Sequence, residues 1–402
     1  MASAFLASLT SVMKKAKIVS ESLSPLVIAE ASLRANIINL PTGRFLAAGQ
    51  NQFRTLWTRD FCHAARGLLV MGETEVVRDH LSRLLKCVRK DGLVPRVLDN
   101  RIVQWRVAYQ TVRKFFPFLP QLELREHLRP QYTDEHGSHA VDSNLLVLLA
   151  ALQLRSYAGG EAWWQENESE LKRVWAWYAG KIQDGFVQQT AFADWQDSVR
   201  RSGVTFLTNL FYLLAAKRLT AVGWDTGVDA ESLAIRLRER FFDKTSGVFL
   251  SLLGSDVVSV DGNLIALEAA EFLSAEEKKN LWQALKLHPV TALGICSYPE
   301  WPKRDIAWHV QFAGLKRYHG GLAWSWLMGL ALKVGHLQND REFVEMLRTK
   351  IHGLLLRDGE VVELYDPQDL WLPWSSWLLT AERPFSWGAG YLIDALYATD
   401  KT

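Results

Sequence analysis

Cysteine is scarce in this chain of 402 residues, and a large excess of charge of one sign is absent. The three cysteines, Cys62, Cys87 and Cys296, lie far apart and form no CxxC pair, which argues against a disulfide framework and favours a reducing cytoplasm. The formal net charge is +2 with both signs interspersed, so neither nucleic acid nor an anionic membrane is an expected partner. No uncharged apolar run approaches 18 residues, so we expect a soluble protein without a membrane-spanning helix.

Several sequence motifs of metal-binding sites, nucleotide-binding sites and serine nucleophiles are also missing. The ten histidines form no HExxH motif, and the aspartates form no EF-hand loop. There is no P-loop, no GxGxxG opening a helix after a strand, and no Gly-x-Ser-x-Gly elbow. We therefore expect no cofactor and no metal. At the amino terminus the basic residues 14, 15 and 17 follow the apolar stretch, the reverse of a signal peptide, so residues 1–9 are interpreted as the first helix.

Tryptophan, by contrast, is abundant, with 17 in the chain. Two acidic patches, 194–198 (DWQDS) and 363–366 (ELYD), set carboxylates directly among aromatic residues. A stretch of charged residues that is simply exposed to solvent would not normally contain large aromatic side chains. Sugar sites need both residue types, because carboxylates bind hydroxyls or protonate glycosidic oxygens while aromatic rings stack on the apolar faces of pyranoses. A small carbohydrate is therefore the expected partner.

An internal repeat indicates how the chain is organised. Residues 141–146 (VDSNLL) recur as 260–265 (VDGNLI), each time opening an apolar helical run. Related helix starts can be placed at 59–61, 203–205, 319–321 and 385–387, so six similar units account for the chain.

The helices opened at these starts are apolar nearly all round, as in 145–154 and 206–214, which is typical of helices buried on both sides. Between them, amphipathic charged segments predict outer helices at 75–90, 166–177, 229–242, 275–287 and 340–355. With an amino-terminal helix added, six inner and six outer helices alternate. This pattern predicts an all-α protein, a single (α/α)6 toroid over residues 1–402, with short strands only in loops, such as 248–252 and 361–364. Loops before the inner helices would gather at one end and bring the acidic patches into one cleft.

Several patches resemble the alkaline and neutral invertases: 59–61 (RDF), 69–77, 141–143, 318–321 (YHGG) and 363–366 follow in that family's order. Trp195-Gln196-Asp197 and the patch at 363–366 also resemble the glucosidase domain of glycogen-debranching enzymes. The resemblance extends over residues 57–395 as spaced blocks and implies an (α/α)6 glycosidase. Where the invertases have His-Asn-Gly-Gly, this chain has His319-Gly320-Gly321, which leaves the sugar open.

The resemblance implies an inverting mechanism, in which a general acid and a general base stand roughly 6.5–9.5 Å apart to admit a water. It places Asp197 as the acid, whose pKa a flanking Trp wall could raise by desolvation, with Asp194 as the alternative. Glu363 is the expected base. Its alternative role is that of a strand-edge carboxylate paired with Arg383, which would make Asp366 or Glu382 the rival base.

Further residues are expected to bind the sugar. Arg59 and Asp60 would hold hydroxyls, although a buried ion pair at a helix start explains them equally well. Asp142 and Asp261 both sit where helix capping alone would suffice, and only Asp142 is assigned a contact. The expected substrate-binding residues are Trp57, Arg59, Asp60, Asp142, Asp194, Trp195, Gln196, His319, Trp324, Trp374, Arg383 and Trp387.

The sequence thus favours an inverting glycoside hydrolase that releases terminal glucose from a small α-glucoside, either sucrose or a short α-glucan. Loops 98–121 and 297–317 would form the aglycone pocket. Two alternatives stay open. A sugar isomerase or epimerase on the same barrel would use paired histidines, for which His309 and His319 are available. A non-catalytic sugar-binding toroid would leave one of the two carboxylates idle.

Overall fold

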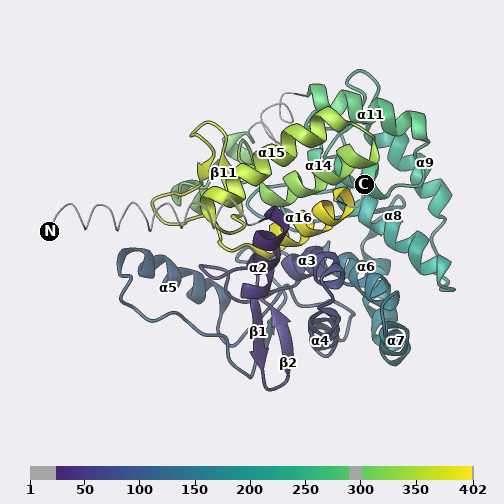
Figure 1. Ribbon diagram of the computed structural model, residues 1–402. Coiled ribbons are helices and arrows are strands. Elements are labelled where there is room, and N and C mark those ends of the chain that lie inside the picture. Colours follow the sequence, from purple (N-terminus) through teal and green to yellow (C-terminus); the bar gives the residue numbers. More distant parts are fainter. Residues whose placement is uncertain (1–23, 289–300, 401–402) are drawn as a thin grey trace.

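The computed structural model describes residues 24–288 and 301–400, which form two concentric layers of helices (Figure 1). The expected helix at 1–9 lies outside the described residues. None of the described helices is both long and apolar enough to cross a membrane. Of the cysteines, Cys62 and Cys87 are described, and both are free thiols.

Six helices form a closed inner ring. Each packs against the next, and the last contacts the first. In α8 every residue from Phe206 to Ala216 is buried, as a helix enclosed on both sides requires. The inner helices are α3 (Thr58–Val70), α6 (Ser143–Arg155), α8 (Phe206–Ala221), α10 (Val260–Ala269), α14 (Ser325–Leu337) and α16 (Ser386–Thr399).

Six outer helices each pack on an inner neighbour, with α2 lying on α16 and α4 on α3. Polar caps fix several of their starts: Ser274 and Glu277 form a reciprocal capping box at α11, and Asp340 caps α15. The alternation confirms the predicted (α/α)6 toroid. The outer helices are α2 (Pro25–Ala35), α4 (Thr74–Leu85), α7 (Gly160–Ala176), α9 (Ala230–Phe241), α11 (Ala275–Leu287) and α15 (Arg341–Asp358).

The asparagine side chains of the repeated VDSN and VDGN segments hydrogen-bond to backbone groups. Asn144 accepts a hydrogen bond from the Val94 amide and donates to the Gly92 and Val174 carbonyls. Asn263 likewise accepts from the Phe249 amide and donates to the Phe249 and Ser259 carbonyls. Each buried side chain thus ties an inner helix to an adjacent segment of chain, so this part of the repeat is structural.

Short strands surround the inner-helix starts. One sheet contains β3 (Leu56–Trp57), β4 (Val97–Asp99) and β5 (Arg129–Gln131), and its strand β3 directly precedes α3. A second sheet contains β10 (Ala323–Trp324), β11 (Leu364–Asp366) and β12 (Leu372–Pro373), and its strand β10 directly precedes α14. The register Trp324↔Leu364 brings the patch at 363–366 beside the start of α14, although the two are 40 residues apart in sequence.

Three two-stranded hairpins complete the strands of the described residues: β1 (Ile37–Leu40) with β2 (Gly43–Leu46), β6 (Ile182–Gln183) with β7 (Phe186–Val187), and β8 (Phe242–Asp243) with β9 (Val248–Phe249). The strands predicted at 248–252 and 361–364 are therefore present but shifted or shorter. Two further helices, α5 (Val103–Phe115) and α13 (Trp308–Phe312), lie in loops where no helix was predicted.

Candidate active site

A cavity of about 670 Å³ opens at the end of the barrel where the inner helices begin. It is lined by segments from both ends of the chain, including residues at the starts of α3 and α16. The predicted convergence of the two acidic patches is present, because Asp197 and Glu363 both line this cavity. The other predicted residues that line it are Trp57, Arg59, Asp60, Trp195, His319, Trp324, Trp374 and Trp387.

Two arginines hold Asp197 in the cavity wall. Arg96 Nη2 lies 2.8 Å from Asp197 Oδ2, and Arg59 Nη1 lies 3.4 Å from the same oxygen. Burial alone would raise the pKa of Asp197, but Arg96 and then Arg59 outweigh it and hold the pKa below its ordinary value. The prediction that a Trp wall raises the pKa of Asp197 is therefore wrong, because the two guanidinium groups outweigh burial. No sequence pattern indicates Arg96 as a neighbour of Asp197.

Glu363 has a different environment. Its Oε1 accepts a hydrogen bond from the Tyr318 hydroxyl at 2.5 Å, and its Oε2 accepts from the Glu382 amide at 2.9 Å. Burial raises its pKa to about 7, although both hydrogen bonds oppose the rise. The alternative pairing with Arg383 is not formed, since Arg383 binds Glu360 at 2.6 Å instead. Glu363 is thus a buried carboxyl that exchanges its proton near neutral pH.

Asp60, at the start of α3, supplies a third carboxylate to the cavity. Burial raises its pKa to about 7, and the nearby positive charge of Arg59 opposes this rise. The two rival bases lie elsewhere: Asp366 pairs with Arg317 at 2.7 Å, and buried Glu382 receives hydrogen bonds from the amides of residues 51 and 53. Neither of them lines the cavity.

Aromatic rings form the floor of the cavity around Trp195. Its ring meets Trp324, Trp326 and Trp387 edge to face, with ring centroids 5.1–5.9 Å apart. Trp195 Nε1 donates to Asp261 Oδ2 at 2.5 Å, which holds the ring in place. Asp261, for which helix capping was a sufficient explanation, thus anchors the floor.

His319 belongs to the same wall. Its ring stacks on Trp324, and its Nδ1 lies 2.5 Å from Ser198 Oγ. Burial lowers the pKa of His319 to about 4, so the ring is neutral at physiological pH.

Four predicted binding residues lie outside the cavity lining. Asp142 is buried against Arg59, with its two oxygens 2.9 and 3.0 Å from the guanidinium, so it positions Arg59. Asp194, the alternative acid, is buried against Arg201 at 2.5 Å. Gln196 is fully buried behind Asp194, and Arg383 faces Glu360 at the surface. Adjacent positions in an irregular loop point in different directions, which the linear pattern does not reveal.

Among the lining residues that were not predicted, three polar ones contact the candidate residues: Arg96, Tyr318 and Ser198. Tyr318 and Ser198 directly adjoin the predicted His319 and Asp197, so their proximity in sequence was an available signal. Arg96 carried none, because it reaches Asp197 only through the pairing of the strands around residues 97–99 and 129–131.

Metal binding was not expected, yet among the described residues Glu135, His136 and His309 place ligand atoms within 4.8 Å of one another. His309 Nε2 lies 3.3 Å from Glu135 Oε1, and Arg96 approaches the same carboxylate at 4.0 Å. This cation competes with a metal ion for Glu135. The three residues lie at the cavity lining.

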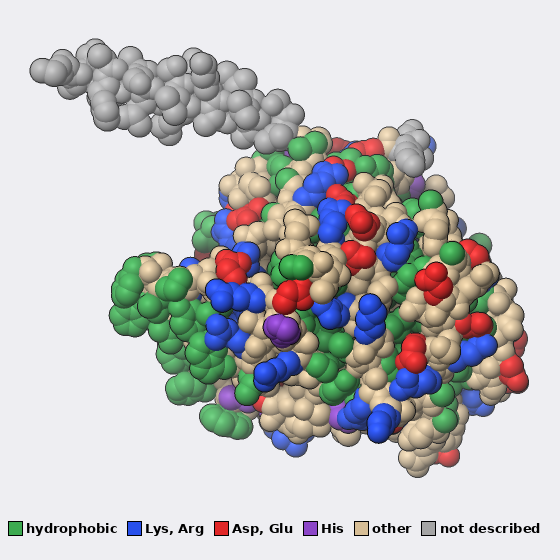
Figure 2. Space-filling model, turned by 90° about the horizontal axis from the view of Figure 1, so that it is seen from below, with side chains coloured by type: hydrophobic (Ala, Val, Ile, Leu, Met, Phe, Trp, Pro, Cys, Tyr) green, Lys and Arg blue, Asp and Glu red, His purple; other side chains and the backbone are tan. Residues whose placement is uncertain are grey.

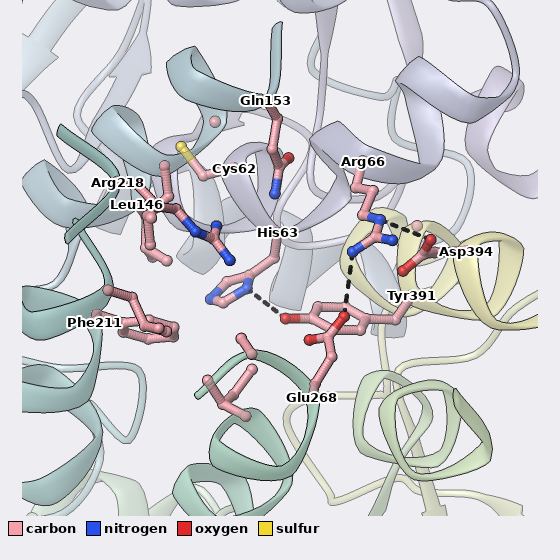
Figure 3. Close-up of a pocket in the computed structure, with 16 residues that line it drawn as sticks. Cys62, His63, Arg66, Leu146, Gln153, Phe211, Arg218, Glu268, Tyr391 and Asp394 are labelled. Carbon is pink, nitrogen blue, oxygen red and sulfur yellow. Dashed lines mark hydrogen bonds and ion pairs between the residues drawn. The ribbon is translucent and has the colours of Figure 1, made fainter. Parts of the chain in front are cut away.

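A second, smaller cavity lies among the later turns of the inner helices (Figure 3). His63 stands in its middle, stacked on Trp387 at 4.2 Å with its Nδ1 3.2 Å from the Tyr391 hydroxyl. Burial lowers the pKa of His63 to about 3. Arg66 reaches Asp394 at 2.8 Å and Glu268 at 3.3 Å across the cavity (Figure 3). His63 lines this cavity and stacks on Trp387, which lines the large one, so an aromatic layer separates the two.

No known protein family matches this sequence, and no curated protein is similar to it. Solved structures are similar in fold. A rhamnosidase from Klebsiella oxytoca with rhamnose bound superimposes with a TM-score of 0.62 at 14% identity, over 94% of this chain. This chain covers only 64% of that rhamnosidase.

A GH63 mannosylglycerate hydrolase from Thermus thermophilus, solved with Tris and D-glycerate, superimposes with a TM-score of 0.61 at 13% identity. There the overlap covers 92% of this chain and 99% of the hydrolase. A glycosidase variant in complex with glucose gives a TM-score of 0.59 at 13% identity, over 93% and 95% of the two chains. All of them share the (α/α)6 fold. At such identity the likeness establishes the fold alone.

Proposed function

We propose that this protein is an inverting glycoside hydrolase that releases terminal glucose from a small α-glucoside, with Asp197 as general acid and Glu363 as general base. One observation carries the proposal. Two carboxyls line one aromatic-floored cavity, and their surroundings move their pKa values in opposite directions, below the ordinary value for Asp197 and to about 7 for Glu363. Separated pKa values in a carboxyl pair are how glycosidases divide acid and base roles, and the acid has the higher value. The resemblance, and not the pKa order of this pair, assigns the acid role to Asp197.

The proposed roles require that substrate binding protonates Asp197 and ionises Glu363. In the ligand-free site Asp197 is ionised beside Arg96, while Glu363 holds its proton up to about pH 7. A leaving-group oxygen that separates Asp197 from Arg96 would raise the pKa of the acid. The exchanged assignment, with Glu363 as acid and Asp197 as base, is the second candidate, and the pKa of the ligand-free site favours it.

Glycosyl fluorides distinguish the two assignments, because fluoride leaves without protonation by a general acid. We expect Asp197→Asn to lose about 10²-fold or more of its activity on an α-glucoside but to keep hydrolysing α-glucosyl fluoride. Glu363→Gln should lose both activities, since water still needs a base. The opposite pattern would exchange the roles. Full activity of both variants would refute the proposal.

The glucose specificity comes from the resemblance, and an NMR time course of the anomeric products tests it. The panel is sucrose, isomaltose, maltose, trehalose and glucosylglycerate. Release of β-glucose from one of them is the expected result and also establishes inversion. Hydrolysis that yields α-glucose would overturn the inverting mechanism, and no cleavage would move the proposal to another glycone or to the isomerase.

The isomerase alternative would need paired histidines. His319 contacts Ser198 and Trp324, whereas His309 contacts Glu135 at the cavity lining, so their partners differ. The non-catalytic alternative would need an idle carboxylate, yet both carboxyls have perturbed pKa values. We also propose a cytoplasmic location, which the free thiols of Cys62 and Cys87 support.

A further inference from the structure

The outer part of the large cavity has a different chemistry from its floor. One wall is α5, which contributes Val103, Val107 and Ala108. Another is the segment of α13 and the residues after it, which contributes Trp308, Val310, Ala313 and Leu315, with His309 as its one polar lining residue. Gln104 is the only polar residue of α5 that lines the cavity. The hydrogen-bonding groups that a second sugar would need are thus largely missing from these walls.

The two walls are connected by the loop at 374–380. Lys114 of α5 donates to the carbonyls of Ser376 and Leu379, and Trp377 Nε1 donates to the Phe312 carbonyl of α13 at 2.9 Å. The Trp377 ring also lies edge to face on Phe312. The apolar walls therefore form a continuous border of the cavity.

On the sides of α5 away from the cavity, polar residues face the protein and apolar residues face outward. Arg106 is fully buried in a bidentate pair with Asp99, at 2.5 and 2.9 Å, which fixes the rotation of the helix. Trp105 and Val112 are left exposed on its outer side. Figure 1 shows α5 projecting from the barrel, and Figure 2 shows hydrophobic side chains gathered on this projection.

Exposed aromatic residues continue this apolar surface outward. Phe118, which follows α5, is 81% exposed, and Trp308 and Phe312 of α13 are 77% and 66% exposed. Exposed apolar patches of this kind mark binding surfaces, because their contact with water is unfavourable. Here the surface is continuous with the candidate catalytic cavity, so the substrate itself is the occupant that the geometry favours.

We infer that the aglycone subsite accepts a hydrophobic group, an aryl or long alkyl chain, in preference to a second sugar. This inference rests on the proposed glycosidase function and narrows its substrate class. The glycone would occupy the floor beside Asp60, Asp197 and Glu363, while the aglycone leaves between α5 and α13.

The test compares methyl and octyl α-glycosides of glucose, mannose and rhamnose, below the micelle concentration. For the glycone that is cleaved, kcat/KM should be at least about tenfold higher with octyl than with methyl. Val107→Gln and Leu315→Gln should each reduce this ratio. Ile235→Gln changes an exposed residue on α9, away from the cavity, and is expected to leave the ratio unaltered.

An octyl-to-methyl ratio near one, or faster cleavage of disaccharides, would overturn the inference and leave the glycosidase intact. If no glycoside is cleaved, the proposed function fails, and calorimetry of octyl glucoside still decides the inference. Saturable binding that Val107→Gln abolishes and Ile235→Gln retains would support it, and no binding would refute it. Binding to phosphatidylcholine–phosphatidylglycerol vesicles that Phe118→Ser abolishes, with a ratio near one, would assign the surface to a membrane and overturn it.

Discussion

At the residue scale, the protonation of each cavity carboxyl depends on the cations and donors around it as well as on burial. Asp197 meets two guanidinium groups, whereas Glu363 meets only a hydroxyl and an amide. The sequence identified both carboxylates because they stand among aromatic residues. It could not supply the partner Arg96, since that contact arises only when the chain folds. Residue types in a motif are readable from sequence, but their electrostatic neighbours are not.

Arg96→Met tests which role Asp197 has. Loss of the nearest cation raises the pKa of Asp197 toward its ordinary value or above it. The pH profile of kcat/KM reports groups of the free enzyme. Because Asp197 has the lower pKa of the pair, the acidic limb reports it in either role and should move to higher pH. If Asp197 is the acid, the plateau of the profile should also rise, because the reactive form with Asp197 protonated and Glu363 ionised becomes more populated. If Asp197 is the base, the plateau should not rise.

The control for this measurement is Arg89→Met, which removes a surface cation paired with Asp91 at 2.7 Å. It should leave both limbs in place, because Arg89 does not line the cavity. A profile that Arg96→Met leaves unmoved would contradict the assignment of Asp197 to the reaction.

Glu382 should make stability depend on pH. Burial raises its folded-state pKa to about 8 from the ordinary 4.5. The neutral carboxyl therefore contributes its full stability below about pH 4.5, and this contribution is lost as pH rises through about 8. Glu382→Gln stays neutral, so relative to wild type its thermal midpoint should rise between pH 5 and pH 8.5. Exposed Glu345→Gln matches the change in charge, and its difference from wild type should be the same at both pH values.

At the scale of elements, local signals predicted most of the barrel. The outer helix at 275–287 has the predicted bounds, because an amphipathic run follows a capping box. The start predicted at 319–321 lies before α14, which begins at Ser325, since strand β10 intervenes to pair with β11. Helix α5 was missed, because its polar Arg106 and Gln110 face the protein while apolar residues such as Trp105 face outward. Periodicity shows that a helix has two faces but not which face is buried.

The closure of the inner ring depends on a close approach of α3 and α16. A methyl group at Gly67 would lie 2.6 Å from Gly390 Cα, a contact that only a backbone shift relieves. We expect Gly67→Ala to lower the free energy of unfolding by roughly 1–3 kcal/mol, measured by urea denaturation.

Gly353→Ala is the matched control for this substitution. Gly353 is an exposed residue within α15, and a methyl group there meets no neighbour. Because alanine favours a helix more than glycine does, this variant should gain about 0.5–1 kcal/mol. Equal effects of the two substitutions would show that the two helices can separate without cost.

At the scale of the whole molecule, the barrel has two ends with different roles. Loops at the starts of the inner helices build the large cavity, whereas later turns of α3, α10, α14 and α16 contribute a charge network. Buried Lys333 contacts Glu268 and lies 2.6 Å from Asp394, and Arg66 reaches the same two carboxylates. Four helices that are distant in sequence are thus joined by alternating charges.

Lys333→Met tests whether the charge network serves stability and not the cavity. Among the described residues it leaves Glu268 and Asp394 with the half-exposed Arg66 as their ion-pair partner. Removing one partner of a buried network typically costs about 3–5 kcal/mol, so the unfolding midpoint in urea should fall clearly. Lys217→Met, which removes a cation from two exposed glutamates, should cost no more than about 1 kcal/mol. The activity per folded molecule of Lys333→Met should equal that of wild type, because no residue of the network lines the large cavity and the aromatic layer of Trp326 and Trp387 belongs to its floor. Lost activity with unchanged stability would instead mean that the charge network sets the geometry of the cavity through this aromatic layer.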